Sequence, residues 1–361
     1  MRKRTILLVA LSGGFIGIAF AWSGLFNVAA SSGHFKLTAW FLHYVMRQSV
    51  KTHAFGIKPP NVEDMVLVRR GGAHFETACA FCHGSPIADP NPVALQMTPA
   101  PPSLRTTMDD WRPQELFWIV KHGIKYTGMP AWPAQDRDDE VWAMVAFLRK
   151  LPSMTDVEYR KIAFGASLTG SVQLPGTPAQ LKSCMRCHGE DGRGDEGGAF
   201  PRLDIQSRDY LIVALRSYVD GERQSGIMEA AAAGLGSREL DALAAYFARS
   251  SPQAASTSKK HAGDPLILRG RQIAERGIPD KRIPACADCH PAGGDGRDGR
   301  PEFPRLEGQY DRYLLEQLTL FAEEKDRGGT RFSSLMTSFA HRLGDEDRRA
   351  VAIWYASLKI P

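Results

Sequence analysis

The sequence predicts an all-α protein in which three small helical domains follow one another behind an N-terminal apolar helix. Three observations predict this organisation. Apolar side chains recur at the three- and four-residue spacing of helices, and no segment shows the period of two that marks strands. One cysteine motif occurs three times, about 100 residues apart, in a chain of 361 residues. The segments around its last two occurrences repeat each other.

The chain starts with basic residues followed by an uncharged apolar stretch. Residues 2–4 are Arg, Lys and Arg, and no charge follows from Thr5 to Gly33. This pattern is typical of an export signal, and more than about 20 apolar residues also span a bilayer as a helix. The length favours a retained signal anchor over residues 1–33, although residues 28–30 (Val-Ala-Ala) fit a cleaved signal peptide. Both place the domains on the periplasmic face of the bacterial inner membrane.

Residues 34–60 form a juxtamembrane segment with amphipathic character. Trp40, Phe41 and Tyr44 recur at helical spacing. A helix of this kind lies at a membrane surface with its aromatic rings at headgroup level. Packing of the same helix on the first domain fits the pattern equally well.

All of the cysteines belong to the motif Cys-x-x-Cys-His. Its residues are Cys79, Cys82 and His83; Cys184, Cys187 and His188; and Cys286, Cys289 and His290. This is the attachment signature of c-type haem, in which both thiols bind the porphyrin and the histidine binds the iron. A thioredoxin-like pair would lie in a βαβ pattern, which is absent. A zinc site would need four ligands at closer spacing. The sequence therefore predicts three covalently bound haem c groups.

We expect three haem domains over residues 61–155, 175–250 and 264–361. A short proline- and glycine-rich stretch at 174–180 and a stretch rich in Ser, Ala and Lys at 250–265 separate them. In the first domain, Pro113 opens a helix that stops at Gly123, and a second helix covers residues 139–150.

The second and third domains are copies of one module. Residues 200–203 (Phe-Pro-Arg-Leu) recur at 303–306, and the later methionines and aromatic residues keep their spacing. Both copies close with an amphipathic helix, for which Ser237 and Asp345 are the expected N-caps.

The second axial ligand of each iron decides whether a haem carries electrons or binds a ligand. A thioether favours ferrous iron and raises the reduction potential. Met228 and Met336 are the sole methionines after the motif in their domains, at matching repeat positions. They are therefore the expected ligands opposite His188 and His290.

The choice is wider in the first domain. Its candidates are Met97, Met108, Met129 and Met144. Met129 lies 46 residues after His83, between Gly128, which permits close backbone approach, and Pro130, which stiffens the loop. We expect Met129 to be the ligand; His122 would be the alternative for bis-histidine ligation.

Two prolines follow the haem histidines at similar spacing in the repeated domains. Pro201 and Pro304 lie 13 and 14 residues after His188 and His290. Their carbonyl groups either accept the proton on histidine Nδ1, which would orient the ring, or simply belong to a turn.

These features resemble class I bacterial cytochromes c. From about residue 175 onward, the Phe-Pro-Arg-Leu pair, the late methionines and residues 270–290 are similar to diheme cytochrome c4. The resemblance implies two all-helical domains with His/Met-ligated haems; Pro291, where many relatives have Gly, departs from it. Residues 128–132 (Gly-Met-Pro-Ala-Trp) are similar to single-haem cytochrome domains of respiratory complexes.

The interpretation that follows is an electron carrier without catalytic residues. It would take electrons from a quinol-oxidising complex or a dehydrogenase and pass them toward a terminal oxidase. The alternatives are a cytochrome c subunit of a membrane-bound dehydrogenase, and a haem enzyme or gas-binding protein with one open iron. The net charge of +5, from 45 basic and 40 acidic residues that are dispersed along the chain, gives no indication of nucleic-acid binding.

Overall fold

The computed structural model describes residues 2–165, 179–195, 197–249, 264–291, 303–323, 327 and 332–360. Within these ranges every regular element is a helix, and extended pairing is limited to isolated bridges. The predicted all-α fold class is therefore confirmed. Most residues of the two expected linkers lie outside the described ranges.

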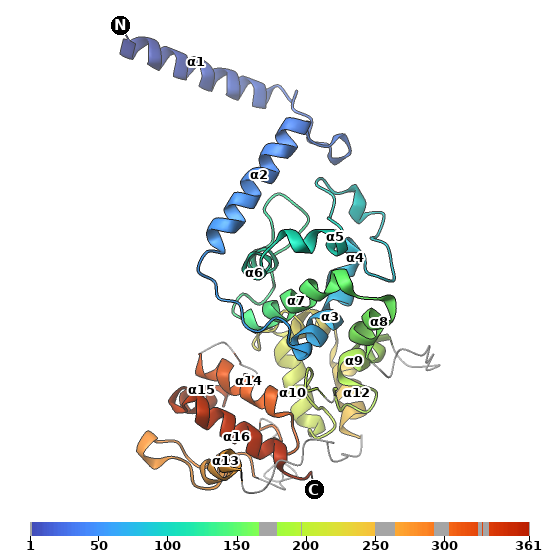
Figure 1. Cartoon of the computed structure of the whole chain (residues 1–361), viewed down its shortest axis with the longest axis vertical. Helices are drawn as coiled ribbons and strands as arrows, with labels where there is room; N and C mark the ends of the chain where they lie inside the picture. The colour runs from blue at the N-terminus through green and yellow to red at the C-terminus, as the bar shows by residue number, and fades with distance from the viewer. Residues whose placement is uncertain are drawn as a thin grey trace.

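Two helices project from the rest of the molecule at its N-terminal end (Figure 1). They are α1 (Arg2–Trp22) and α2 (Lys36–His53). The 20 residues Lys3–Trp22 are long and apolar enough to cross a membrane, and none of them is buried in the protein. A cleaved signal sequence has the same properties, so the helix agrees with both interpretations of the N-terminus.

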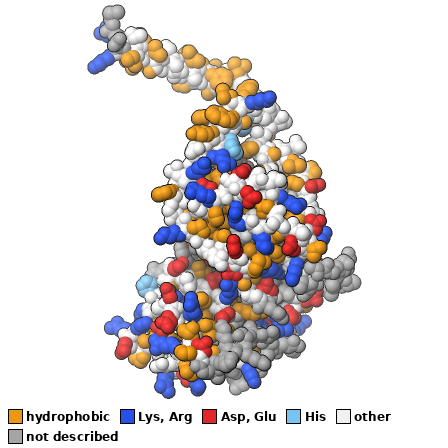
Figure 2. Space-filling view, viewed as in Figure 1, with side chains coloured by type: hydrophobic (Ala, Val, Ile, Leu, Met, Phe, Trp, Pro, Cys, Tyr) orange, Lys and Arg blue, Asp and Glu red, His pale blue; other side chains and the backbone are white. Residues whose placement is uncertain are grey.

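The surroundings of α2 change along its length. Trp40 and Phe41 in its first half are exposed, as are most apolar side chains that cover α1 and the start of α2 in Figure 2. In its second half, Val50 is fully buried and the Arg47 guanidinium lies 4.4 Å from the centre of the Trp111 ring. The second half therefore packs on the first haem-binding part, whereas the first half leaves an apolar face uncovered.

Three hydrophobic clusters divide the rest of the chain into three helical units. The first unit contains α3 (Met65–Ala78), α4 (Ala80–His83), α5 (Leu104–Thr107), α6 (Pro113–His122), α7 (Asp138–Lys150) and α8 (Asp156–Phe164). The second contains α9 (Ala179–His188), α10 (Arg208–Val219), α11 (Met228–Ala232) and α12 (Ser237–Ala248). The third contains α13 (Pro265–Arg276), α14 (Asp311–Ala322), α15 (Ser333–Arg342) and α16 (Asp345–Ser357).

Short 3-10 helices complete the chain. They are η1 (Ala30–Ser32), η2 (Ala94–Gln96), η3 (Met108–Asp110), η4 (Leu151–Ser153), η5 (Pro279–Lys281) and η6 (Cys286–Asp288). The two helices predicted in the first domain are found as α6 and α7, the latter beginning one residue earlier than expected.

A helix before the motif crosses a late helix closely in the first and third units. In the first, a Cβ on Gly71 of α3 would lie 2.2 Å from the carbonyl oxygen of Ala143 in α7. In the third, a Cβ on Gly270 of α13 would lie 2.1 Å from the carbonyl oxygen of Ala350 in α16. Only glycine allows such close backbone approach. Each crossing brings the helix that leads to the haem motif against a late helix of the same unit, α7 in the first and α16 in the third.

The closing helices start where predicted, but their N-caps differ from the prediction. Ser237 and Asp345 are the first helical residues of α12 and α16, and the capping positions are occupied by Gly236 and Gly344 in extended conformation. Glycine is tolerated at an N-cap, and an acidic residue in the first turn, such as Asp345, interacts favourably with the helix dipole.

The second and third units meet through reciprocal amide hydrogen bonds. Gln309 Oε1 accepts from the backbone N–H of Arg202 at 3.0 Å, and its Nε2 donates to the carbonyl of Arg202 at 3.0 Å. Gln206 makes the same two bonds with Arg305, at 3.0 and 2.8 Å. The repeat in the sequence thus becomes a two-fold relation between the units, centred on the two Phe-Pro-Arg-Leu segments.

Candidate haem sites

The three Cys-x-x-Cys-His motifs lie at helix ends or in short helical turns. In the first unit Cys79 caps α3, and Cys82 and His83 belong to α4. In the second, the whole motif lies in the last turns of α9. In the third, Cys286 opens η6 and His290 follows Cys289, its C-cap. All six thiols are free and partly buried, so none is used in a disulfide.

A proline carbonyl orients each of the three histidine rings. His188 Nδ1 lies 3.2 Å from the carbonyl oxygen of Pro201, and His290 Nδ1 lies 2.9 Å from that of Pro304. Because a carbonyl can only accept, Nδ1 carries the proton and Nε2 keeps a free lone pair for a metal. Of the two interpretations of these prolines, the orienting one therefore fits the geometry.

The first unit has the same device in a place that the sequence did not indicate. His83 Nδ1 lies 3.0 Å from the carbonyl oxygen of Pro102, which is 19 residues further along the chain. The longer spacing hides the equivalence with Pro201 and Pro304. The loop after the first motif holds several prolines, so the sequence alone does not single out Pro102.

Burial keeps the motif side chains neutral. It lowers the pKa of His188 to about 4 and also lowers the pKa of His83 and of His290, against the opposing effect of the proline carbonyls. It raises the pKa of Cys79 to about 12 and of Cys184 to about 11. Neutral imidazoles with a free Nε2 are the form in which histidine ligates iron.

One cavity of about 660 Å³ joins the motifs of the second and third units. Its wall contains the four cysteines, both histidines and both expected thioether ligands of these units: Cys184, Cys187, His188, Met228, Cys286, Cys289, His290 and Met336. The structure therefore brings together all the predicted site residues of these two units. The arrangement allows two flat cofactors to lie close to each other in one apolar enclosure.

Aromatic residues shield the histidines of this cavity. The rings of Phe200 and Phe247 lie edge-on to the His188 ring, at 6.2 and 6.5 Å between centres. The His290 ring meets Phe303 in the same way at 5.9 Å, and Tyr355 donates a hydrogen bond of 3.1 Å to the His290 carbonyl. These contacts exclude water from the side of the ring that faces the protein.

Met129 does not line the cavity that lies beside His83. His83 lines this separate cavity of about 550 Å³. Met129 lies in a loop whose carbonyl groups press against Gly123, where an added Cβ would come within 2.6 Å of the Met129 oxygen. The Met97 side chain packs against the backbone of Gly128, and its sulfur would lie 2.4 Å from a Cβ at that position.

Two of the other candidate methionines of the first unit are core residues. Met108 and Met144 are 4% and 1% exposed and belong to the hydrophobic cluster. Both side chains are therefore part of the packed interior of the first unit. His122 is exposed and its ring lies against Trp118 at 5.2 Å, on the outer face of α6.

Buried arginines test whether the large cavity suits a porphyrin. Arg223, Arg305 and Arg327 line it, and each has a buried Nε that meets no acceptor in the part of the chain that the structure describes. An unpaired buried donor costs about 1–3 kcal/mol. The propionate carboxylates of a haem are acceptors that would satisfy these nitrogens with charge-assisted hydrogen bonds.

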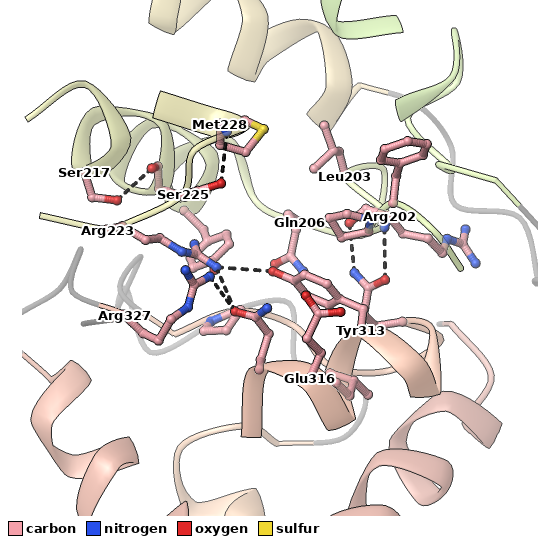
Figure 3. Close-up of a pocket in the computed structure, with 18 of the residues that line it drawn as sticks. Arg202, Leu203, Gln206, Ser217, Arg223, Ser225, Met228, Tyr313, Glu316 and Arg327 are labelled. Carbon is pink, nitrogen blue, oxygen red and sulfur yellow. Dashed lines mark hydrogen bonds between the residues drawn. The ribbon is translucent and has the colours of Figure 1, made fainter. Parts of the chain in front are cut away.

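The positive charge around these arginines also favours a cofactor that carries carboxylate groups. Arg223 and Arg327 form an isolated backbone bridge, and Figure 3 shows their side chains next to each other. Both donate to Gln317 Oε1, at 3.3 and 2.7 Å. Burial alone would raise the pKa of Tyr218, but Arg223, Arg327 and Arg137 lower it below its ordinary value. The positive potential is therefore not fully compensated by the protein, and the residues present fit haem c.

Other metal chemistry has little support in the described ranges. No group of three or more His, Cys, Asp or Glu side chains converges there in a way that could hold a metal ion.

His74, a buried histidine that sequence reasoning missed, also lines the large cavity, and burial lowers its pKa to about 4. Its ring lies edge-on to Trp132 at 5.0 Å.

Comparison with known families agrees with this geometry. Residues 66–148 match the family "Cytochrome C oxidase, cbb3-type, subunit III", and residues 267–359 match the family "Cytochrome c". The first match covers the first unit up to α7, and the second covers nearly all of the third unit.

Individual relatives resemble about half of the chain. Cytochrome c-552 of Acidithiobacillus ferridurans is 36% identical over 197 residues, which are 54% of this chain and 81% of that protein. A thiosulfate dehydrogenase electron acceptor of Thiomonas intermedia is 34% identical, over 50% of this chain and 80% of that protein. Cytochrome c4 of Pseudomonas aeruginosa is 32% identical, over 53% of this chain and 93% of that protein.

These matches, the three Cys-x-x-Cys-His motifs and the all-helical fold lead to one conclusion. The chain belongs to the c-type cytochromes, with a first unit like subunit III of cbb3-type cytochrome c oxidase and a C-terminal half like diheme cytochrome c4.

Proposed function

We propose that this protein is a membrane-held triheme cytochrome that carries electrons from a periplasmic dehydrogenase or a quinol-oxidising complex toward a terminal oxidase. The observation that carries the proposal is the one cavity whose wall contains two sets of two cysteines, a histidine and a methionine. When bound, haem c supplies one-electron chemistry between ferric and ferrous iron. The chain supplies ligands, orientation and exclusion of water.

Each side chain has a defined role in the proposal. The six cysteines hold three haem groups covalently, and His83, His188 and His290 each provide one axial nitrogen. Met129, Met228 and Met336 provide the opposite thioether. The carbonyls of Pro102, Pro201 and Pro304 fix the imidazole rings by accepting from Nδ1. A carbonyl acceptor also makes Nε2 a stronger donor to iron.

We further propose that the haem-binding parts of the chain are residues 61–155, 175–250 and 264–361, and that residues 1–33 anchor them. The uncovered apolar side chains of α1 and of the first half of α2 support membrane attachment. The aromatic rings of Trp40 and Tyr44 stack at 5.9 Å on the exposed part of α2, as expected for a helix at headgroup level. The haem-binding parts would then lie in the periplasm.

The comparisons support two sides of an electron path. The first unit is similar to an oxidase subunit, which supports a terminal oxidase as the acceptor. A relative of the C-terminal half is an electron acceptor for thiosulfate dehydrogenase, which supports a dehydrogenase as the donor. Co-purification after mild detergent extraction would identify these partners. If a catalytic chain remains bound at fixed stoichiometry, the protein is a subunit of a dehydrogenase rather than a free carrier.

The ligand assignments are tested by replacing the three methionines one at a time with alanine. Optical and magnetic spectra during a reductive titration should show that each change removes one sulfur-ligated, low-spin haem and leaves two. Met97→Ala is the matched control in the first unit, because the Met97 sulfur lies beside Gly128 and next to the proposed ligand Met129. Loss of a sulfur-ligated haem in this variant, with none in Met129→Ala, would transfer the role to Met97.

Carbon monoxide separates a carrier from the haem-enzyme alternative. In the proposed carrier each of the three irons has six ligands. The reduced protein should therefore bind carbon monoxide slowly or not at all. Rapid binding at one haem would indicate an open iron and would favour a gas-binding or peroxidase-type function.

A further inference from the structure

The loop that leads to Met228 is held by the first unit as well as by its own. Residues 224–228, here called the Met228 loop, connect the bridge at Arg223 to α11. A Cβ on Gly226 would lie 2.2 Å from Nε1 of Trp132 and 2.7 Å from its Cε2, so the indole packs directly on the bare backbone. The neighbouring Ile227 packs against the hydrophobic cluster of the first unit.

Glu140 on α7 is the centre of this contact. Its side chain is 3% exposed, and one of its carboxylate oxygens accepts from the backbone N–H of Gly226 at 2.7 Å and from Trp132 Nε1 at 3.3 Å. The other accepts from the hydroxyl of Ser225 and pairs with Arg137 at 2.9 Å. A buried carboxylate requires such compensation, and half of it comes from the Met228 loop.

The network reaches the backbone of Met228 itself. Ser225 Oγ, which donates to Glu140, accepts from the Met228 N–H at 3.0 Å (Figure 3). Arg137 also donates to the carbonyl of Gln224 at 2.9 Å. A continuous chain of hydrogen bonds therefore runs from α7 of the first unit to the first residue of α11, which carries the thioether.

The third unit has no equivalent support in the described residues. Hydrogen bonds of α15, which carries Met336, stay within that unit, for example from His341 to the carbonyl of Ala322 and from Arg342 to that of Arg282. The first unit contacts the third elsewhere, through the bidentate pair between Arg70 and Glu316 on α14. Among the described residues, such a link to the first unit is found at the Met228 loop; residues 328–331, which precede α15, are not among them.

We propose that Glu140 is a positioning residue of the first unit that, through Ser225, holds Met228 against the haem iron of the second unit. The inference rests on the proposed ligand role of Met228. Its consequence is that the first unit sets the coordination and the potential of one particular neighbouring haem. Trp132, three residues after the proposed ligand Met129, then packs directly on the Met228 loop.

The test uses the full-length protein carrying its haem groups. Glu140→Gln keeps the shape of the side chain, but its amide group cannot accept from both Ser225 and Gly226. Ser225→Ala is the second variant, since it leaves the buried charges untouched and removes only the link to Met228. Glu115→Gln is the matched control, because Glu115 is 2% exposed in the same unit and bonds to Arg112, away from the Met228 loop.

The readouts are the sulfur-to-iron charge-transfer absorption of the ferric protein, the potential of each haem and carbon monoxide binding after reduction. Glu140→Gln and Ser225→Ala should each weaken the sulfur signal of one haem in three, lower its potential and open it to carbon monoxide. Combining either with Met228→Ala should cause no further loss. Glu115→Gln should leave all three haems as they are.

Two outcomes are separable. If Met228→Ala removes one sulfur-ligated haem while Glu140→Gln and Ser225→Ala leave all three signals and potentials unchanged, the positioning role is overturned. If Met228→Ala itself leaves the three signals intact, the ligand assignment in the proposed function fails instead. Should Glu140→Gln fail to fold, Ser225→Ala decides the positioning role alone.

Discussion

The substitution Gly270→Ala should destabilise the third unit and disturb the site around His290. A Cβ at this position would lie 2.1 Å from the oxygen and 2.6 Å from the carbon of the Ala350 carbonyl, and 2.7 Å from Trp354 Cβ. Ordinary contacts of a Cβ begin at about 3.4 Å. Because the atoms in the way are mainly backbone, α13 and α16 must move apart by more than an ångström.

The size of the effect follows from two opposing contributions. Overpacking of this kind costs about 1–3 kcal/mol or more, whereas alanine in place of glycine within a helix returns about 1 kcal/mol. The net free energy of unfolding should therefore fall by up to about 2 kcal/mol, toward the upper end of that range because the obstructing atoms are mainly backbone. Separation of the helices also loosens Tyr355, which is 1% exposed and donates to the His290 carbonyl at 3.1 Å.

Denaturant unfolding monitored by haem absorption and by circular dichroism measures this change. Gly344→Ala is the control, because Gly344 precedes the same α16 and an added Cβ meets no atom within 4 Å. It should cost about 0.5–1 kcal/mol through the weaker N-cap, without moving α13 away from α16. If Gly270→Ala is as stable as Gly344→Ala, the close helix crossing does not hold the third unit together.

Three further predictions concern the contacts between units. Gln206→Leu and Gln309→Leu each remove two reciprocal hydrogen bonds and should lower stability by similar amounts, about 1–3 kcal/mol each; very unequal thermal unfolding shifts would contradict the two-fold relation. Glu316→Gln leaves Arg70, which is 8% exposed, without its bidentate partner. It should cost about 2–4 kcal/mol and make the junction with the first unit more sensitive to proteases, and unchanged sensitivity would argue against that docking contact. The hydrogen bonds from Arg312 lower the pKa of Asp64 below 3.8, so its stabilising effect is present above that pH and is lost as the pH falls through the lowered value. Asp64→Asn should therefore flatten the acid limb of the stability curve by at most about 1 kcal/mol, since the pair is partly exposed, and an unchanged acid limb would show that the pair does not contribute.

The sequence predicted those features of the fold that depend on neighbouring residues. Helix positions such as 139–150 follow from the spacing of apolar side chains, and the duplicated Phe-Pro-Arg-Leu segments follow from direct comparison. The same local signals gave the wrong N-cap residues. Ser and Asp are common at N-caps, but the N-caps before Ser237 and Asp345 are glycines. A shift of one residue leaves the periodic pattern unchanged, so periodicity could not detect it.

Contacts between units lay beyond the reach of local patterns. Glu140 meets Ser225 across 85 residues, and Arg70 meets Glu316 across 246. Both glutamates lie in amphipathic helices, where an acidic side chain normally faces solvent. Pro102 was missed for a related reason, because the loop after the first motif is longer than in the repeated units. Whether such a charged side chain is buried and paired can be judged only when the element that packs against it is known.

The central claim is that three porphyrins are covalently attached to this chain and that each iron is held by imidazole and thioether. Intact-mass analysis of the native protein, combined with magnetic circular dichroism of its ferric state, tests both parts together. The account predicts three attached haem groups per chain and three low-spin irons with sulfur ligation. A mass with fewer than three haem groups, or a resting spectrum dominated by five-coordinate iron, would contradict it.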